Sequence, residues 1–235
     1  MFVSAVVVAG GSGIRMGLAV PKPLIRICGV PMLFYSLQAL EKCDSVSEVV
    51  LVLPEKGEQQ LASLGGSGRF TKVRTVVRGG PRRQDSVYNG LRACDERAEI
   101  VVIHDAARPM LQSDWVTSEI LSLKGYAGAV YATPITDTLK QKSAGNVIER
   151  TVSRENLYAV QTPQVFRKEW LLKAHKQAGA TGLAVTDDAQ LVEAIGGRIR
   201  LLQGNRWNIK VTFQDDLIVA GVLLEARSRE WFASE

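Results

Sequence analysis

The stretch that decides the fold runs from Val3 to Pro23 and reads VSAVVVAGGSGIRMGLAVPKP. It begins with a short apolar run rich in β-branched residues, which is typical of a buried strand in a parallel sheet. The Gly-Gly-Ser-Gly turn that follows lets backbone N–H groups face an anionic ligand. Arg15 and Lys22 then add two cations. A strand that leads into a glycine loop with two cations predicts a polyphosphate site.

Two common phosphate-binding loops do not fit this stretch. The dinucleotide fingerprint needs glycines at its first, third and sixth positions, and counting from Gly11 the sixth position is Met16. No acidic residue lies about twenty positions further on to hold a ribose. The P-loop does not fit because no Gly-Lys-Ser/Thr follows the turn. An NAD-binding oxidoreductase is therefore disfavoured.

Length, charge and cysteine content favour a soluble cytoplasmic protein, and anionic small substrates would explain its modest positive charge. The 235 residues suffice for one substantial α/β domain, and the net charge of +5 comes without basic runs interleaved with aromatics, so neither a nucleic-acid nor a membrane partner is expected. Cys28, Cys43 and Cys94 are widely spaced, which indicates reduced thiols. With two histidines, no protein-held metal site is expected. The N-terminus does not have the pattern of a signal peptide.

Strands and helices are predicted to alternate along most of the chain. Apolar runs predict strands at 3–8, 49–53, 73–77, 100–103, 128–132, 198–202 and 208–211. Helical periodicity predicts helices at 32–42, 55–64, 84–97, 113–124, 168–178, 187–195 and 215–227. This alternation predicts an α/β fold, a mostly parallel sheet with helices on both faces.

Residues 135–161 interrupt the alternation. Thr, Val, Ile and charged residues surround a turn at 144–146, which predicts an antiparallel hairpin standing off the main sheet. QTPQVF at 161–166 is interpreted as a turn, and TDDA at 186–189 as a helix cap. We therefore expect a single domain over 1–235 with a protruding β-arm at about 135–161.

Ligands of open parallel sheets lie beyond the carboxyl ends of the strands. The loops after the first, third, fourth and fifth strands should therefore converge. They carry Arg15 and Lys22, residues 79–86, Asp105 with Arg108, and residues 136–138. Asp105 and Arg108 could bind ligand or could be an ion pair that tethers their loop. His104 is interpreted as a structural histidine.

In order along the chain, these motifs resemble those of one family. GGSGIRMG with PKP is similar to the signature loop of nucleotidylyltransferases, and GG..RQDSV, HDAARP, TDTLK, VSREN, QTPQ, TDDA and NIKVT extend the match. The chain resembles the 2-C-methyl-D-erythritol 4-phosphate cytidylyltransferases of the non-mevalonate isoprenoid pathway. That resemblance implies a Rossmann-like nucleotidyltransferase fold and transfer of CMP from CTP to this acceptor, with release of pyrophosphate.

The resemblance also implies roles for particular residues. The catalytic cations would be Arg15, Lys22 and Lys210. The nucleotide would contact Ala9, Gly10, Gly11, Ser12, Gly13, Gly80, Ser86 and Asp105. The acceptor would contact Asp105, Arg108, Thr138, Arg154, Thr162, Thr186 and Lys210. Mg²⁺ would bridge the CTP phosphates. The family forms homodimers through the arm, so Thr138 and Arg154 would reach the partner subunit's site.

Other functions remain open at this point. A ribitol-5-phosphate cytidylyltransferase shares the loop and an HDA.RP motif, but TDTLK and VSREN favour methylerythritol phosphate because the arm touches the acceptor. A sugar-1-phosphate nucleotidylyltransferase usually lacks HDAARP. A non-catalytic nucleotide-binding protein would be expected to lose Arg15, Lys22 or Lys210, and all three are present.

Overall fold

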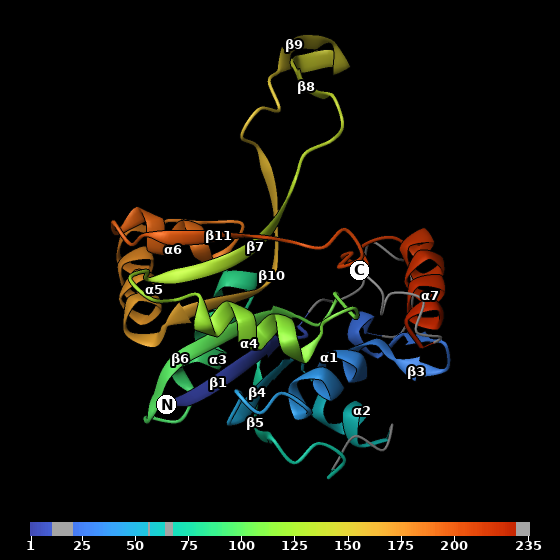
Figure 1. Cartoon of the computed structure of the whole chain (residues 1–235), viewed down its shortest axis with the longest axis vertical. Coiled ribbons are helices and arrows are strands. Elements are labelled where there is room, and N and C mark those ends of the chain that lie inside the picture. Colours follow the sequence, from blue (N-terminus) through green and yellow to red (C-terminus); the bar gives the residue numbers. More distant parts are fainter. Residues whose placement is uncertain (11–20, 56, 64–67, 229–235) are drawn as a thin grey trace.

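The computed structural model describes residues 1–10, 21–55, 57–63 and 68–228. A seven-stranded sheet forms its centre. The strands are β1 (Phe2–Val8), β4 (Glu48–Leu53), β5 (Val73–Arg78), β6 (Ala98–Asp105), β7 (Gly128–Pro134), β10 (Tyr158–Arg167) and β11 (Ile199–Gln203). Their order is β11-β7-β10-β6-β1-β4-β5. β10 is antiparallel to β6 and β7, and the other neighbours are parallel, which confirms the predicted mostly parallel sheet (Figure 1).

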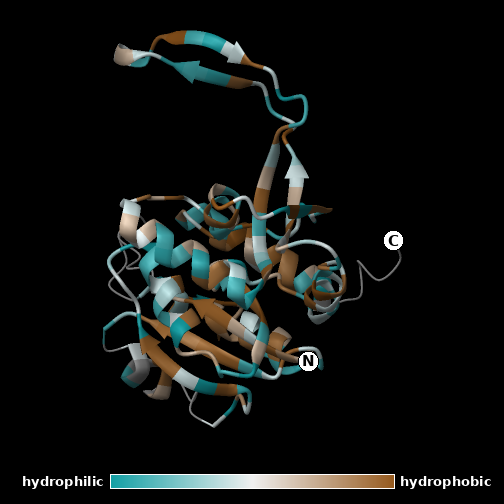
Figure 2. Cartoon of the chain, turned by 90° about the vertical axis from the view of Figure 1, so that its left-hand side faces the viewer, coloured by the Kyte–Doolittle hydropathy of each residue, from teal (hydrophilic) through white to brown (hydrophobic). Residues whose placement is uncertain are grey.

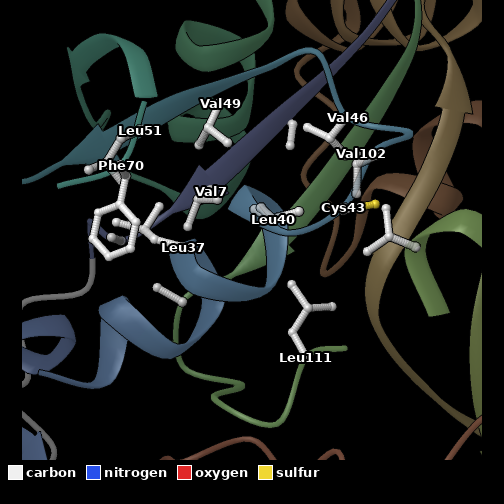
Figure 3. Packing of buried hydrophobic residues seen from close by; sticks show 14 of the residues in the cluster. Val7, Leu37, Leu40, Cys43, Val46, Val49, Leu51, Phe70, Val102 and Leu111 are labelled. Carbon is white, nitrogen blue, oxygen red and sulfur yellow. The ribbon is translucent and has the colours of Figure 1, made fainter. Parts of the chain in front are cut away.

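Helices pack on both faces of the sheet, as predicted. The helices are α1 (Met32–Glu41), α2 (Gly57–Ser63), α3 (Arg83–Arg92), α4 (Ser113–Leu121), α5 (Lys168–Thr181), α6 (Asp188–Ala194) and α7 (Gln214–Ser228). α1 and α4 contribute Leu37 and Val116 to a core that contains Val7 of β1 (Figure 3). α3, α5 and α6 contribute to a second core that contains Val6. Successive strand residues face opposite sides of a sheet, so β1, which is apolar except for Ser4, is buried on both faces.

The predicted hairpin is present. β8 (Leu139–Lys142) and β9 (Ile148–Val152) pair antiparallel around the short 3₁₀ helix η3 (Ala144–Asn146). The hairpin projects far from the sheet, and its residues are almost all exposed (Figures 1 and 2). The main sheet, in contrast, is largely apolar, and hydrophilic residues lie mostly on the helices and loops around it (Figure 2).

Two of the predicted local structures are wrong. QTPQVF is not a turn but the buried part of β10, and its proline lies where the pairing with β7 shifts register between Val160 and Gln164. A proline is tolerated in a central strand at such an irregularity. Residues 208–211 are not a strand. A backbone hydrogen bond joins Val211 N–H to the Ala107 carbonyl at 2.8 Å, but no ladder of bonds forms around it.

The remaining predicted elements are present within a few residues of their expected bounds, apart from α3. That helix ends at Arg92 rather than at 97, since Ala93 N–H bonds to the Gly90 carbonyl and Cys94 N–H to that of Leu91. Such i→i+3 bonds tighten the last turn of a helix. No helix of the described residues is long and apolar enough to cross a membrane.

The packing of α1 on the sheet predicts a large effect of truncating Leu37, which is 1% exposed. Leu37→Ala should lower the free energy of unfolding by about 2–5 kcal/mol, because the cavity cannot collapse fully. Leu121→Ala is the matched control, as this side chain is 75% exposed, and its effect should stay within about 0.5 kcal/mol. Urea unfolding of both variants measures the difference, and equal losses would contradict the packing.

Candidate active site

A cleft of about 390 Å³ opens at the carboxyl ends of β1, β5 and β6. Ala9 and Gly10 follow β1, Gly80 follows β5, and Asp105 ends β6. β4 and β5 lie to one side of β1 and β6 lies to the other. The chain connections therefore diverge at β1, and open α/β sheets bind ligands in the crevice at such a point.

Backbone hydrogen bonds fix the loops that line this edge. Ala9 N–H donates to the Val52 carbonyl at 2.8 Å, and Ala106 N–H donates to the Val8 carbonyl at 3.0 Å. Each loop is thus bonded to the end of a neighbouring strand. The floor of the cleft therefore continues the hydrogen-bonding pattern of the sheet.

The start of α3 forms one wall. Ser86 Oγ accepts a hydrogen bond from Gly80 N–H at 3.0 Å and donates to the Arg82 carbonyl at 3.1 Å. A Cβ at position 80 would collide with Asp85, so glycine is required there. Asp85 accepts from Arg82 N–H at 3.1 Å and caps the helix start. Ser86 therefore holds the glycine turn rather than capping α3.

Asp105 forms two ion pairs at the base of the cleft. Its Oδ1 accepts from Arg83 Nε at 2.8 Å, and its Oδ2 accepts from Lys210 Nζ at 2.7 Å. Burial alone would raise the pKa of Asp105, but the charges of Arg83 and Lys210 outweigh it and hold the pKa well below its usual range. The carboxylate is therefore ionised at neutral pH.

The lining of the cleft carries an excess of positive charge. Its cations are Lys22, Arg82, Arg83 and Lys210, and its carboxylate among the described residues is Asp105. Lys22 begins the short 3₁₀ helix η2 (Lys22–Leu24), which brings it beside the loop after β1. Several cations around one anion favour a polyanionic ligand such as a triphosphate.

Arg108 lies next to the cleft but does not pair with Asp105. Its Nη1 donates to the Asn208 carbonyl at 2.6 Å and its Nη2 to the Val160 carbonyl at 3.4 Å. It takes no part in the ion pairs found among the described residues. The tethering Asp105–Arg108 pair considered from the sequence is therefore wrong, and the Arg108 guanidinium keeps a charge that can bind an anion.

His104 and Thr162 support this edge from below. Thr162 Oγ1 accepts from Asp105 N–H at 3.1 Å and lies 3.3 Å from His104 Nδ1. The other ring nitrogen lies 3.1 Å from Ser36 Oγ and 3.2 Å from the Arg108 carbonyl. Burial lowers the pKa of His104 to about 4. The prediction of a structural histidine is confirmed, and its low pKa leaves it uncharged at neutral pH.

Several predicted site residues lie away from this cleft or outside the described residues. Gly11, Ser12, Gly13 and Arg15 fall outside the described ranges. Thr138 and Arg154 are exposed at the base of the hairpin, where Arg154 donates to the Thr136 carbonyl. Thr186 is exposed before α6. Residues 136–138 therefore do not converge with the other loops in this chain, contrary to the expectation.

Arg83 and Asp188 are the residues that sequence reasoning missed. The sequence placed Arg83 only within the loop at 79–86 and Asp188 only within the helix cap at 186–189. In the structure Arg83 Nη1 donates to Asp188 Oδ2 at 2.8 Å. The two positions are 105 residues apart, so no local spacing could have indicated the pair.

The low pKa of His104 predicts a pH dependence of stability. The unfolded chain takes up a proton near the ordinary histidine pKa, whereas the folded protein does so only near pH 4. Stability is therefore complete above about pH 6.5 and falls by roughly 3 kcal/mol as the pH drops to about 4. His104→Gln should flatten this part of the profile in urea unfolding at pH 7 and pH 5. A ring proton of His104 that titrates near pH 6.5 by NMR would contradict this account.

Comparisons with known proteins agree over nearly the whole chain. The family model for 2-C-methyl-D-erythritol 4-phosphate cytidylyltransferase (IspD) matches residues 3–226. The proteins of that name from Caldanaerobacter subterraneus subsp. tengcongensis and Pelotomaculum thermopropionicum are 39% and 40% identical, covering 95% and 96% of this chain and 99% and 95% of theirs.

Solved structures give the same result. The 4-diphosphocytidyl-2C-methyl-D-erythritol synthase of Anaerococcus prevotii superposes with a TM-score of 0.81 at 28% identity, covering 95% of this chain and 98% of that one. The 2-C-methyl-D-erythritol 4-phosphate cytidylyltransferase of Thermus thermophilus gives 0.77 at 30% identity, covering 94% and 98%. This chain belongs to the 2-C-methyl-D-erythritol 4-phosphate cytidylyltransferase family.

Proposed function

We propose that this protein transfers CMP from CTP to 2-C-methyl-D-erythritol 4-phosphate in the non-mevalonate isoprenoid pathway. The products are 4-diphosphocytidyl-2-C-methyl-D-erythritol and pyrophosphate. One observation carries the proposal beyond family membership. Four cationic side chains line the cleft at β1, two of them paired with Asp105, beside the glycine turn at Gly80. That combination suits a nucleoside triphosphate, whose base can enter the turn and whose phosphates need the cations.

The chemistry requires positioning and charge neutralisation. An oxygen of the acceptor phosphate attacks the α-phosphorus of CTP in line, and the bond from that phosphorus to the bridging oxygen breaks. Pyrophosphate leaves with the electron pair. A phosphate monoester dianion is already nucleophilic, so no strong general base is needed. Lys22 and Lys210, with Arg15, would stabilise the charge that develops on the phosphate oxygens.

The described residues fit a magnesium ion that would be held chiefly by the triphosphate and its waters, with Asp105 as the one carboxylate among them that lines the cleft. Mg²⁺ commonly keeps several waters and binds one or two carboxylates plus substrate phosphates. Asp105 is the described carboxylate in the cleft, and Arg83 and Lys210 already engage both of its oxygens. The described part of the chain contains no cluster of three or more metal-binding side chains. When bound, Mg²⁺ would neutralise triphosphate charge.

The acceptor would lie between the cleft and a partner's hairpin. Arg108 and Thr162 adjoin the base of the cleft beside Asp105. Thr138 and Arg154 lie on the exposed arm. The hairpin turn also exposes apolar side chains, with Val147 63% and Ile148 60% exposed. A homodimer joined by the arms would cover these side chains and bring Thr138 and Arg154 to the partner subunit's site.

Pyrophosphate release with CTP and Mg²⁺ tests the acceptor directly. Turnover is expected with 2-C-methyl-D-erythritol 4-phosphate and not with ribitol 5-phosphate, because the motifs on the arm favour the first. Turnover with ribitol 5-phosphate alone would refute the assigned acceptor. No turnover with either acceptor, from folded protein that binds CTP, would favour the non-catalytic alternative.

Heterodimers test whether the arm completes the partner's site. Lys22→Ala and Arg154→Ala should each lower kcat by about 10²–10³-fold without loss of fold. A dimer with one subunit of each variant contains one site with both residues intact, because Lys22 and Arg154 at that site come from different subunits. Its activity, after purification on two affinity tags, should be roughly half that of the wild-type dimer.

If each arm instead folds back on its own subunit, every site in the mixed dimer lacks one of the two residues. Activity no higher than that of the single variants would therefore refute the shared site. A sedimentation measurement on the wild-type protein shows independently whether the dimer forms.

A further inference from the structure

We propose that Asp188, acting through Arg83, is a positioning residue that fixes Asp105 and Lys210 in the cleft. The inference rests on the proposed function, because its kinetic test measures cytidylyl transfer. Four side chains form one row of ion pairs in which acidic and basic groups alternate. Asp188 Oδ2 accepts from Arg83 Nη1 at 2.8 Å, Arg83 Nε donates to Asp105 Oδ1 at 2.8 Å, and Lys210 Nζ donates to Asp105 Oδ2 at 2.7 Å.

The acidic members of this row are more deeply buried than Lys210 at its end. The side chain of Asp188 is 1% exposed, that of Asp105 10% and that of Arg83 25%, whereas that of Lys210 is 44% exposed. Water screens such inner charges weakly, so each one depends on its partner. The planar guanidinium presents its donors in fixed directions and so orients two carboxylates relative to one another, whereas the donors of an ammonium rotate freely on a flexible stem.

The start of α6 is itself tied to two other elements. The side-chain amide of Gln84 in α3 donates to the Leu183 carbonyl at 3.1 Å and accepts from Val185 N–H at 3.2 Å. Gln164 in β10 donates to Asp187 Oδ2 at 3.0 Å. Both glutamines are buried. These hydrogen bonds therefore hold the backbone that carries Asp188 in a fixed position relative to the sheet.

Asp188 does not contact the cleft directly. It is not among the residues that line that cleft, where Arg83 and Asp105 are. Its second oxygen faces His175, with Oδ1 3.6 Å from Nε2, and His175 stacks on Tyr88 with ring centroids 5.3 Å apart. Any influence of Asp188 on bound substrate must therefore pass through Arg83.

This arrangement decides where the Lys210 ammonium lies. Lys210 belongs to an extended segment outside the sheet, and Asp105 is the carboxylate that holds its Nζ. If Arg83 loses Asp188, its guanidinium can turn, and Asp105 loses a fixed partner. A catalytic group displaced by about 1 Å can cost roughly a hundredfold in rate.

A double-mutant cycle between Asp188→Asn and Lys210→Ala separates this role from general stabilisation. In the wild-type background Asp188→Asn should lower kcat by roughly ten- to a hundredfold. In the Lys210→Ala background it should change kcat by less than about twofold, because the group that it positions is absent. Losses that multiply would overturn the proposal. If Asp188→Asn fails to fold, Asp188→Glu takes its place in the same cycle, with the same expected outcomes, because the longer side chain moves the carboxylate out of the position that holds Arg83.

Asp95→Asn is the matched control, since Asp95 pairs with Arg97 at 2.8 Å and neither residue lines the cleft or contacts Arg83. It should leave kcat unchanged and have little effect on stability, because ion pairs at the surface contribute little.

A crystal structure of the Asp188→Asn or Asp188→Glu protein provides a readout besides activity. The bonds from position 83 to Asp105 should open, and the Lys210 ammonium should shift. An unmoved Asp105–Lys210 pair would overturn the proposal. If the wild-type protein shows no turnover, the proposed function fails, and this structural result alone decides the positioning role.

Discussion

The carboxylate of Asp105 lies between Arg83 at 2.8 Å and Lys210 at 2.7 Å, and the arrangement of the cleft depends on these two contacts. The three residues come from the end of β6, the start of α3 and an extended segment near the C-terminus. Removing one partner from a buried ion pair commonly costs about 3–5 kcal/mol, because a charge is left without compensation. The same contacts that join these segments therefore also place two cations where phosphates would bind.

The sheet makes this arrangement possible. β1 is buried on both faces, with Val6 in one core and Val7 in the other, so its end is a fixed point. Because β4 and β6 flank it on opposite sides, the loops that leave this edge separate and enclose the cleft. The loop after β6 is in turn held by the segment that contains Lys210, since Val211 N–H bonds to the Ala107 carbonyl at 2.8 Å. The core contacts of β1 and the hydrogen bonds of its neighbouring loops therefore stabilise both the sheet and the cleft at its edge.

The sequence predicted those features that local patterns determine. The apolar run of β1, the alternating strands and helices, and the hairpin with its turn at 144–146 each have a short-range signature. QTPQVF was misread because a proline argues against a central strand, whereas the structure accommodates Pro163 where the register shifts. The strand predicted at 208–211 failed because an apolar pattern does not show whether a neighbouring strand is available for pairing.

The candidate site was predictable only in part for a related reason. Glycine turns and the Lys22 motif are continuous in sequence, so they could be recognised directly. The partners of Asp105 were not, because Arg83 and Lys210 are 22 and 105 residues away from it. The nearby Arg108, the obvious candidate from spacing, bonds to backbone carbonyls instead. Tertiary contacts, not spacing, determine which charges meet.

A crystal structure of the protein with CTP and Mg²⁺ would test the central claim most directly. The account predicts the cytidine beside Gly10, Gly80 and Ser86, with the phosphates directed toward Lys22 and Lys210. An alternative is a second hollow, of about 530 Å³, lined by Trp115, Tyr131 and Asn208, among others. A nucleotide bound there, with the cleft at β1 empty, would contradict the account.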